Sequence, residues 1–170
     1  MNREVLIMNQ MWSSELIFLF KNAELCRELL VRYPLLNNSY FIHVRMGDYV
    51  KYPELYHFDK ESYYKRSIDY ILSIDGNPHF FILSDDVSFC REFEIFKHIN
   101  KTIIDVNEMN TLNALYFMSL CNKGGICANS TFSGWASKLN ANMTKIIICP
   151  KQWINVGYDY EIPFDYTISF

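Results

Sequence analysis

The sequence lacks the features that mark several broad classes of protein. Its 170 residues carry a formal net charge of −3 at pH 7 and a pI of about 5.8, so no basic face for nucleic acid is evident. It has no uninterrupted apolar run long enough to cross a membrane, and its first residues lack the basic and apolar regions of a signal peptide. No Gly-x-Gly-x-x-Gly follows an expected strand, which disfavours a dehydrogenase.

The cysteines show no pairing pattern. The chain has five cysteines, an odd number, and no two of them are spaced as Cys-x-x-Cys. Without a signal peptide, this pattern favours free, buried thiols in a reducing compartment. The four histidines are scattered as well, so we expect no metal site. The cysteines are Cys26, Cys90, Cys121, Cys127 and Cys149.

Apolar and aromatic side chains are abundant. Half of the residues are hydrophobic, and the chain contains 13 Phe, 12 Tyr and 3 Trp. This composition argues against disorder and allows one domain with a substantial core. The sequence has no repeat, low-complexity tract or linker. We therefore expect residues 1–170 to form a single domain with an N-terminal helical lead-in and an aromatic C-terminal extension.

Hydrophobic periodicity alternates along the chain between the patterns of strands and helices. Strands separated by single helices form parallel sheets with right-handed crossovers. The sequence therefore predicts an α/β fold, with a Rossmann-like, mostly parallel sheet flanked by helices. Helices are expected at residues 12–32, 60–74, 87–97, 110–121 and 132–139. Strands are expected at residues 40–44, 79–83, 103–106, 126–128 and 145–149. A loop is expected at 49–59, helix-capping glycines at Gly124 and Gly125, and an irregular tail after Trp153.

Three polar segments follow expected strands, and the carboxyl ends of parallel strands share the edge of the sheet where α/β proteins bind ligands. The first segment contains His43 and Arg45, which strand alternation places on the same face. Arg45 can form a forked pair with a phosphate, and Gly47 lets the backbone approach a ligand closely. The alternative is structural, with Arg45 in an ion pair and His43 satisfied in the core.

The second segment is Ser84, Asp85 and Asp86. A carboxylate at a strand end can accept the paired N–H donors of guanine or the hydroxyls of a ribose. The same residues are a good N-terminal cap for the helix that follows. Both roles can hold at once, with one Asp capping the helix and the other contacting the base.

The third segment runs from Asn129 through Ser130 and Thr131 to Phe132, between a short strand and a helix. Hydroxyls and N–H groups at a helix start make a phosphate cradle, and the helix dipole favours an anion there. Plain helix capping is the alternative.

As a set, these segments resemble those of the bacterial-type alpha-1,2-fucosyltransferases, glycosyltransferase family 11. In order, that family has His-x-Arg-Arg-Gly-Asp-Tyr, a helix with Tyr-Tyr, a Phe-Ser-Asp-Asp strand end, Asn-Ser-Ser-Phe-Ser-Trp-Trp and Pro-Lys-x-Trp. The resemblance covers most of the chain and is specific as a set. The similar stretches here are residues 43–49, 63–64, 83–86, 129–135 and 150–153.

The resemblance implies the C-terminal, donor-binding half of a GT-B-like inverting glycosyltransferase. Such an enzyme transfers fucose from GDP-fucose to a hydroxyl of an acceptor glycan, a galactoside in the family, with no cofactor or essential metal. By the resemblance, Arg45 holds the β-phosphate with His43 beside it, and Asp85 or Asp86 contacts guanine. The expected substrate-binding residues are His43, Arg45, Asp85, Asp86, Asn129, Ser130, Thr131 and Phe132.

Arg45 and Asp48 are the expected catalytic residues. Arg45, with the hydroxyls of Ser130 and Thr131, is suited to stabilise the negative charge on departing GDP. Asp48 is the carboxylate nearest the donor motif and is the candidate general base for the acceptor hydroxyl. Its alternative role is that of a turn Asp that bonds the backbone.

The sequence departs from the family pattern in three ways. Met46 stands where the family has its second Arg, which removes a positive charge, and Gly134 stands where it has the first Trp, which removes packing beside the cradle. Family members also open with a Gly-Gly-Leu-Gly-Asn-Gln-Met-like strand-turn-helix that this sequence does not contain, so we expect the N-terminal half to be missing. Alternatives to an enzyme are therefore a truncated, inactive GDP-sugar binding module, a donor subunit that needs a partner chain, and a structural remnant. We expect a cytoplasmic location, or peripheral attachment to a membrane where glycans are assembled.

Overall fold

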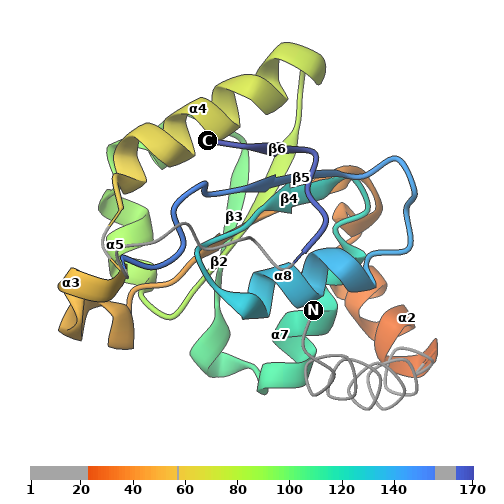
Figure 1. Ribbon diagram of the computed structural model, residues 1–170. Coiled ribbons are helices and arrows are strands. Elements are labelled where there is room, and N and C mark those ends of the chain that lie inside the picture. Colours follow the sequence, from red (N-terminus) through yellow and green to blue (C-terminus); the bar gives the residue numbers. More distant parts are fainter. Residues whose placement is uncertain (1–22, 57, 156–163) are drawn as a thin grey trace, which may run out of the picture. The chain divides into compact units, whose positions relative to one another are not determined.

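The computed structural model describes residues 23–56, 58–155 and 164–170. The chain divides into two compact units, residues 1–34 and 35–170. The described part of the first unit contains helix α2 (Ala23–Arg32), which ends where the sequence predicts (Figure 1). Residues 12–22 of the expected helix lie outside the described residues.

The second unit is built on a six-stranded sheet in which all neighbouring strands are parallel. The strand order β3-β2-β1-β4-β5-β6 is the doubly wound order of Rossmann-like folds, so the predicted fold class is confirmed. Strands β2 and β3 are added on one side of β1, and β4, β5 and β6 on the other, so the strand order reverses between β1 and β4. The strands are β1 (Ser39–Val44), β2 (His79–Ser84), β3 (Lys101–Asp105), β4 (Gly124–Ile126), β5 (Ile146–Cys149) and β6 (Ile168–Ser169).

Helices cover both faces of this sheet, with α4 on one side and α7 and α8 on the other (Figure 1). The longer helices are α4 (Lys60–Ile74), α7 (Thr111–Leu120) and α8 (Thr131–Leu139). The shorter ones are η1 (Leu36–Asn38), η2 (Asp48–Lys51), α3 (Pro53–Tyr56), α5 (Val87–Glu92), α6 (Glu94–Lys97) and η3 (Val106–Glu108). Along the described parts of the chain, no helix has both the length and the apolar character needed to cross a membrane.

The neighbouring strands β1 and β2 are buried along their whole length, as expected for strands covered on both faces. Their alternate residues pack against α4 in one core cluster. On the opposite face, the ring of Phe81 lies 5.1 Å from that of Phe117 in α7, and the ring of His43 lies 5.6 Å from that of Phe132 in α8. The cluster on the α4 side includes Tyr40, Ile42, Val44, Phe80, Ile82, Tyr63, Tyr64, Ile68 and Ile71.

The prediction that Gly124 and Gly125 cap a helix is wrong. Helix α7 ends at Leu120 with Cys121 as its cap, and both glycines lie in strand β4, which starts two residues before the predicted strand. A Cβ at Gly125 would collide with the ring and carbonyl of Phe41 on the neighbouring strand. These glycines therefore permit close approach between strands.

Two other segments contain helical structure that differs from the prediction. The helix expected at residues 87–97 is divided into α5 and α6, because Phe93 is extended and its ring packs 5.0 Å from that of Phe96. The loop expected at 49–59 contains η2 and α3, held together by rings of Tyr49 and Tyr56 stacked at 4.0 Å.

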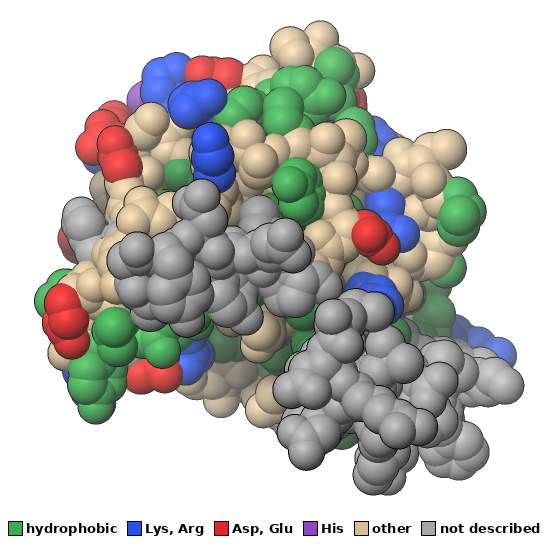
Figure 2. Space-filling view, in the orientation of Figure 1, with side chains coloured by type: hydrophobic (Ala, Val, Ile, Leu, Met, Phe, Trp, Pro, Cys, Tyr) green, Lys and Arg blue, Asp and Glu red, His purple; other side chains and the backbone are tan. Residues whose placement is uncertain are grey.

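The end of the chain adds a strand that the sequence did not predict. Thr167 and Phe170 donate backbone hydrogen bonds to Ile147 and Cys149 of β5, which makes β6 the edge of the sheet. All five cysteines are free thiols, and four of them are buried as predicted, whereas Cys26 is partly exposed. On the face drawn in Figure 2, acidic and basic side chains are interspersed.

Candidate functional site

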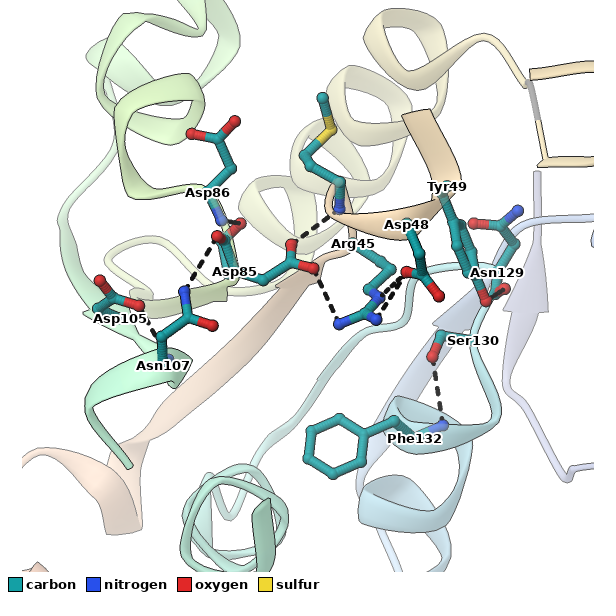
Figure 3. Close-up of polar contacts among 12 residues, drawn as sticks. Arg45, Asp48, Tyr49, Asp85, Asp86, Asp105, Asn107, Asn129, Ser130 and Phe132 are labelled. Carbon is teal, nitrogen blue, oxygen red and sulfur yellow. Dashed lines mark hydrogen bonds and ion pairs between the residues drawn. The ribbon is translucent and has the colours of Figure 1, made fainter. Parts of the chain in front are cut away.

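The predicted site residues lie at the carboxyl edge of the sheet, around the point where the strand order reverses. Residues 45–49 follow β1, and residues 129–132 follow β4, its neighbour on the other side of that point. Ligands of doubly wound sheets bind in the crevice at this position. Figure 3 shows Arg45 between Asp48 and Asp85 at this edge, whereas the side chain of Asp86 points away from them. The structure therefore brings together the three segments that the sequence singled out.

Arg45 forms ion pairs with two carboxylates, one on each side of its guanidinium (Figure 3). Asp48 Oδ1 accepts from Arg45 Nε at 3.0 Å and from Nη2 at 2.6 Å, and Asp85 Oδ2 lies 2.8 Å from Nη1. The side chain of Asp48 is 57% exposed, whereas that of Asp85 is 9% exposed. Asp48 is therefore the partner that can leave Arg45 at small cost, because exposed ion pairs contribute little.

Asp85 reaches Arg45 because of the register of the sheet. Val44 of β1 pairs with Ser84 of β2, so Arg45 and Asp85 are the next residues along two neighbouring strands. The second oxygen of Asp85, Oδ1, accepts from Met46 N at 2.9 Å. Both carboxylate oxygens of Asp85 thus have partners within the protein.

Asp86 caps the next helix, as the alternative interpretation of this segment predicts. Its Oδ1 accepts from Phe89 N at 2.9 Å at the start of α5. Asn107, just after β3, donates from Nδ2 to the backbone oxygen of Asp85 at 3.1 Å. Sequence reasoning missed Asn107, although its position after a strand would have been the signal for it.

The loop between β4 and α8 combines helix capping with a buried hydrogen bond of Asn129. Ser130 caps α8, its Oγ accepting from Phe132 N at 3.3 Å, and Thr131 is exposed. Asn129 Nδ2 donates to the backbone oxygen of Trp153 at 3.0 Å, while its buried Oδ1 has no hydrogen-bond partner. This loop therefore presents a helix N-terminus at the site, which is favourable for an anion.

Tyr49 connects the loops after β1 and β4, a role that the sequence did not indicate. Its hydroxyl donates to the backbone oxygen of Asn129 at 3.1 Å, and Arg45 Cζ lies 5.8 Å from the centre of its ring. Burial is the main reason why the pKa of Tyr49 is raised, so the hydroxyl remains a donor.

The Tyr63–Tyr64 pair of α4 anchors the strand ends beneath the site. Tyr64 donates its hydroxyl hydrogen to the His43 carbonyl at 2.7 Å, and the Tyr63 hydroxyl lies 2.6 Å from the carbonyl of Cys127 and 3.1 Å from that of Ile148. Burial raises the pKa of both phenols well above the ordinary value. The pair thus satisfies buried carbonyls at the ends of β1, β4 and β5.

His43 is buried with 3% of its surface exposed, and its Nδ1 has no hydrogen-bond partner. Burial, reinforced by the nearby charge of Arg45, lowers the pKa of His43 to about 3. His43 is therefore neutral near pH 7.

We expect this histidine to make the fold acid-sensitive. The pKa of His43 is lower in the folded chain than the ordinary 6.5, so its contribution to stability is present above pH 6.5 and is lost as pH falls toward 3. From pH 7 to pH 5, the free energy of unfolding should fall by about 2 kcal/mol through this residue. Urea denaturation at pH 7 and at pH 5 measures this change in the free energy of unfolding. His43→Gln should remove this part of the pH dependence, whereas His98→Gln, at an exposed position, should not. If the free energy of unfolding fell equally from pH 7 to pH 5 in the unmodified chain and in both variants, His43 would not be the source of the acid sensitivity.

The space beside Gly134 is filled. The ring of Phe164 lies where a Gly134 side chain would be, and it packs 5.7 Å from the ring of Trp135 and 6.0 Å from that of Trp153. The expectation that this glycine removes packing is therefore wrong, since the ring of Phe164 supplies the packing.

Met46 directs its side chain to the core on the α4 side, and the positive charge that the family has there is absent.

Within residues 23–56, 58–155 and 164–170, no three His, Cys, Asp or Glu side chains are grouped so that they could hold a metal ion. The cationic group that the site does contain is Arg45, held between two carboxylates.

Comparison with known proteins gives two relatives, both from Escherichia coli. The chain is 30% identical over 136 residues to the O-antigen biosynthesis glycosyltransferase WbnK, a match that covers 78% of this chain and 44% of that protein. It is 34% identical over 121 residues to an alpha-1,2-colitosyltransferase, covering 68% of this chain and 41% of that protein. The chain therefore spans less than half the length of either relative. No solved structure matches it.

A family description also matches most of the chain. The sequence model of glycosyl transferase family 11 matches residues 16–160. This range contains all of the candidate site residues, from His43 to Phe132, together with the Tyr63–Tyr64 pair. The chain belongs to glycosyl transferase family 11.

Proposed function

We propose that this chain is the donor-binding part of a fucosyltransferase. It binds GDP-fucose, and the enzyme transfers fucose with inversion to a hydroxyl of an acceptor glycan, a galactoside. The observation that carries this proposal is the position of Arg45 and the start of α8, which follow the two strands that flank the reversal of strand order. A guanidinium and a helix N-terminus are both suited to a diphosphate.

The geometry of Arg45 supports phosphate binding at one edge of its guanidinium. Nε and Nη2 both donate to a single oxygen of Asp48, and together they form the edge that binds an oxyanion in bidentate fashion. Asp48 is largely exposed and can turn toward water. A β-phosphate takes its place on Nε and Nη2, and Asp85 keeps Nη1.

The reaction breaks the bond between the anomeric carbon of fucose and the β-phosphate oxygen. Negative charge develops on departing GDP, and Arg45 stabilises it together with Ser130, Thr131 and the dipole of α8. These groups supply positive potential without a metal. Asp48, once released from Arg45, is the candidate base that takes the proton of the acceptor hydroxyl.

The guanine contact remains assigned to Asp85 or Asp86, with His43 beside Arg45. Asp86 uses Oδ1 to cap α5, which leaves Oδ2 for a base or a ribose. Asn129 and Phe132 complete the wall of the donor site on the α8 side.

A second donor is favoured by one comparison. The relative that is 34% identical is named for transfer of a colitosyl group. Colitose differs from fucose by the absence of one ring hydroxyl, so a GDP-linked colitose would place the same diphosphate on Arg45.

The alternative to an active enzyme is a GDP-sugar binding module, or a donor subunit that works with a partner chain, because the chain spans less than half of either relative.

Calorimetric titration of the purified chain tests the proposal. We expect GDP-fucose and GDP-colitose to bind and UDP-galactose not to bind. The presence of EDTA should leave the dissociation constants unchanged. Equal binding of UDP-galactose, or a strict requirement for a divalent cation, would contradict the donor assignment. The ratio of the two GDP-sugar affinities decides which sugar is the donor.

A further inference from the structure

We propose that Asp85 is a positioning residue for Arg45, acting on the diphosphate through the guanidinium and leaving the guanine contact to other groups. This inference rests on the proposed function of the site. It narrows the assignment of the base contact, which the sequence left open between Asp85 and Asp86.

The hydrogen bonds of Asp85 are the first support for this role. One oxygen lies 2.8 Å from Arg45 Nη1, and the other accepts from Met46 N at 2.9 Å. The carboxylate therefore holds both the side chain of Arg45 and the backbone that follows it. With 9% of its side chain exposed and both oxygens engaged, Asp85 would lose both of these contacts if it turned toward a base.

Gly47 gives independent support, because its missing side chain leaves room for this carboxylate. A Cβ built at Gly47 would collide with Asp85 Oδ2, the oxygen that meets Arg45. The glycine of the motif therefore allows Asp85 to approach the guanidinium. Asp85 is held from its backbone as well, since Asn107 Nδ2 donates to its carbonyl at 3.1 Å (Figure 3).

These contacts give the two carboxylates that bind Arg45 different roles. Asp85 fixes Nη1 and remains in place, whereas Asp48 occupies Nε and Nη2 and is replaced by phosphate. An arginine fixed at one end loses less side-chain entropy on binding than a free one. Asp85 thus prepares the phosphate-binding edge before the donor arrives.

A double-mutant cycle tests the inference, with NMR titration of GDP, inosine diphosphate and inorganic pyrophosphate. Asp85→Asn should weaken all three ligands by about tenfold, the effect of losing one charge-assisted hydrogen bond. In an Arg45→Ala background, Asp85→Asn should weaken none of the three ligands further, because its contribution to binding passes through Arg45. Gly47→Ala should weaken binding in the same way, and Gly76→Ala, where a Cβ meets open space, should not.

Each other outcome has a definite meaning. Selective loss of GDP over inosine diphosphate in Asp85→Asn would identify a guanine contact and overturn the inference. Additive losses in the Arg45→Ala background would show a general structural effect and also overturn it. If the unmodified chain bound neither GDP nor pyrophosphate, the proposed function itself would fail, and this inference with it.

Discussion

Arg45→Ala is expected to remove most of the affinity of this chain for GDP, a loss on the order of 3 kcal/mol or about 100-fold in the dissociation constant. The substitution removes the only positive side chain among the candidate site residues that the structure describes. It also leaves Asp48 and Asp85 without their common cation, so two carboxylates would face the diphosphate. Calorimetric titration with GDP measures the change.

Two further variants separate charge from geometry. Arg45→Lys keeps the positive charge and loses the forked pair of donors, so it should bind GDP with intermediate affinity. Arg66→Ala removes one positive charge from α4, where the guanidinium lies 4.5 Å from the ring of Phe170, and should leave GDP binding unchanged. Comparable dissociation constants for the unmodified chain and Arg45→Ala would rule out the phosphate assignment.

Local patterns in the sequence were sufficient to predict the central part of the fold. Helix α4 begins and ends at the predicted residues, because Asp59 caps its start, accepting from Ser62 N at 3.0 Å, and Asp75 ends it. The apolar stretch of β2 identified a strand covered on both faces. Strand β6 could not be predicted in this way, since two residues are too few to show a period and its pairing depends on β5.

The convergence of the site was predictable, whereas its internal hydrogen bonds were not. Parallel strands bring their carboxyl ends to one edge, and the register between Val44 and Ser84 then places Arg45 beside Asp85. That Asp48 also pairs with Arg45 depends on the 3-10 turn η2, which the sequence suggested to be a loop. The role of Tyr49 depends in turn on a backbone oxygen eighty residues away, at Asn129. Such contacts arise from tertiary packing and leave no local pattern.

The glycines of β4 likewise owe their place to tertiary packing, because they lie where neighbouring strands approach closely. Gly124 has a φ of +108°, a conformation that L side chains rarely adopt, and a Cβ there would collide with the backbone of Ile146 on β5. Backbone strain and overpacking both oppose a side chain at this position. We expect Gly124→Ala to lower the free energy of unfolding by about 3–5 kcal/mol, measured by urea denaturation with circular dichroism.

The matched control is Gly76→Ala, in the exposed turn between α4 and β2. A Cβ at Gly76 meets nothing within 4 Å, so this change should alter stability by no more than about 0.5 kcal/mol. A stable Gly124→Ala chain would mean that β4 and β5 can separate without loss of the fold. In that case the sheet would not hold the start of α8 in a fixed place beside Arg45, and the phosphate cradle would have to form as the ligand binds. A large loss of stability confined to Gly124→Ala would instead show that the fold depends on the close packing of β4 against β5, the strands beneath the proposed donor site.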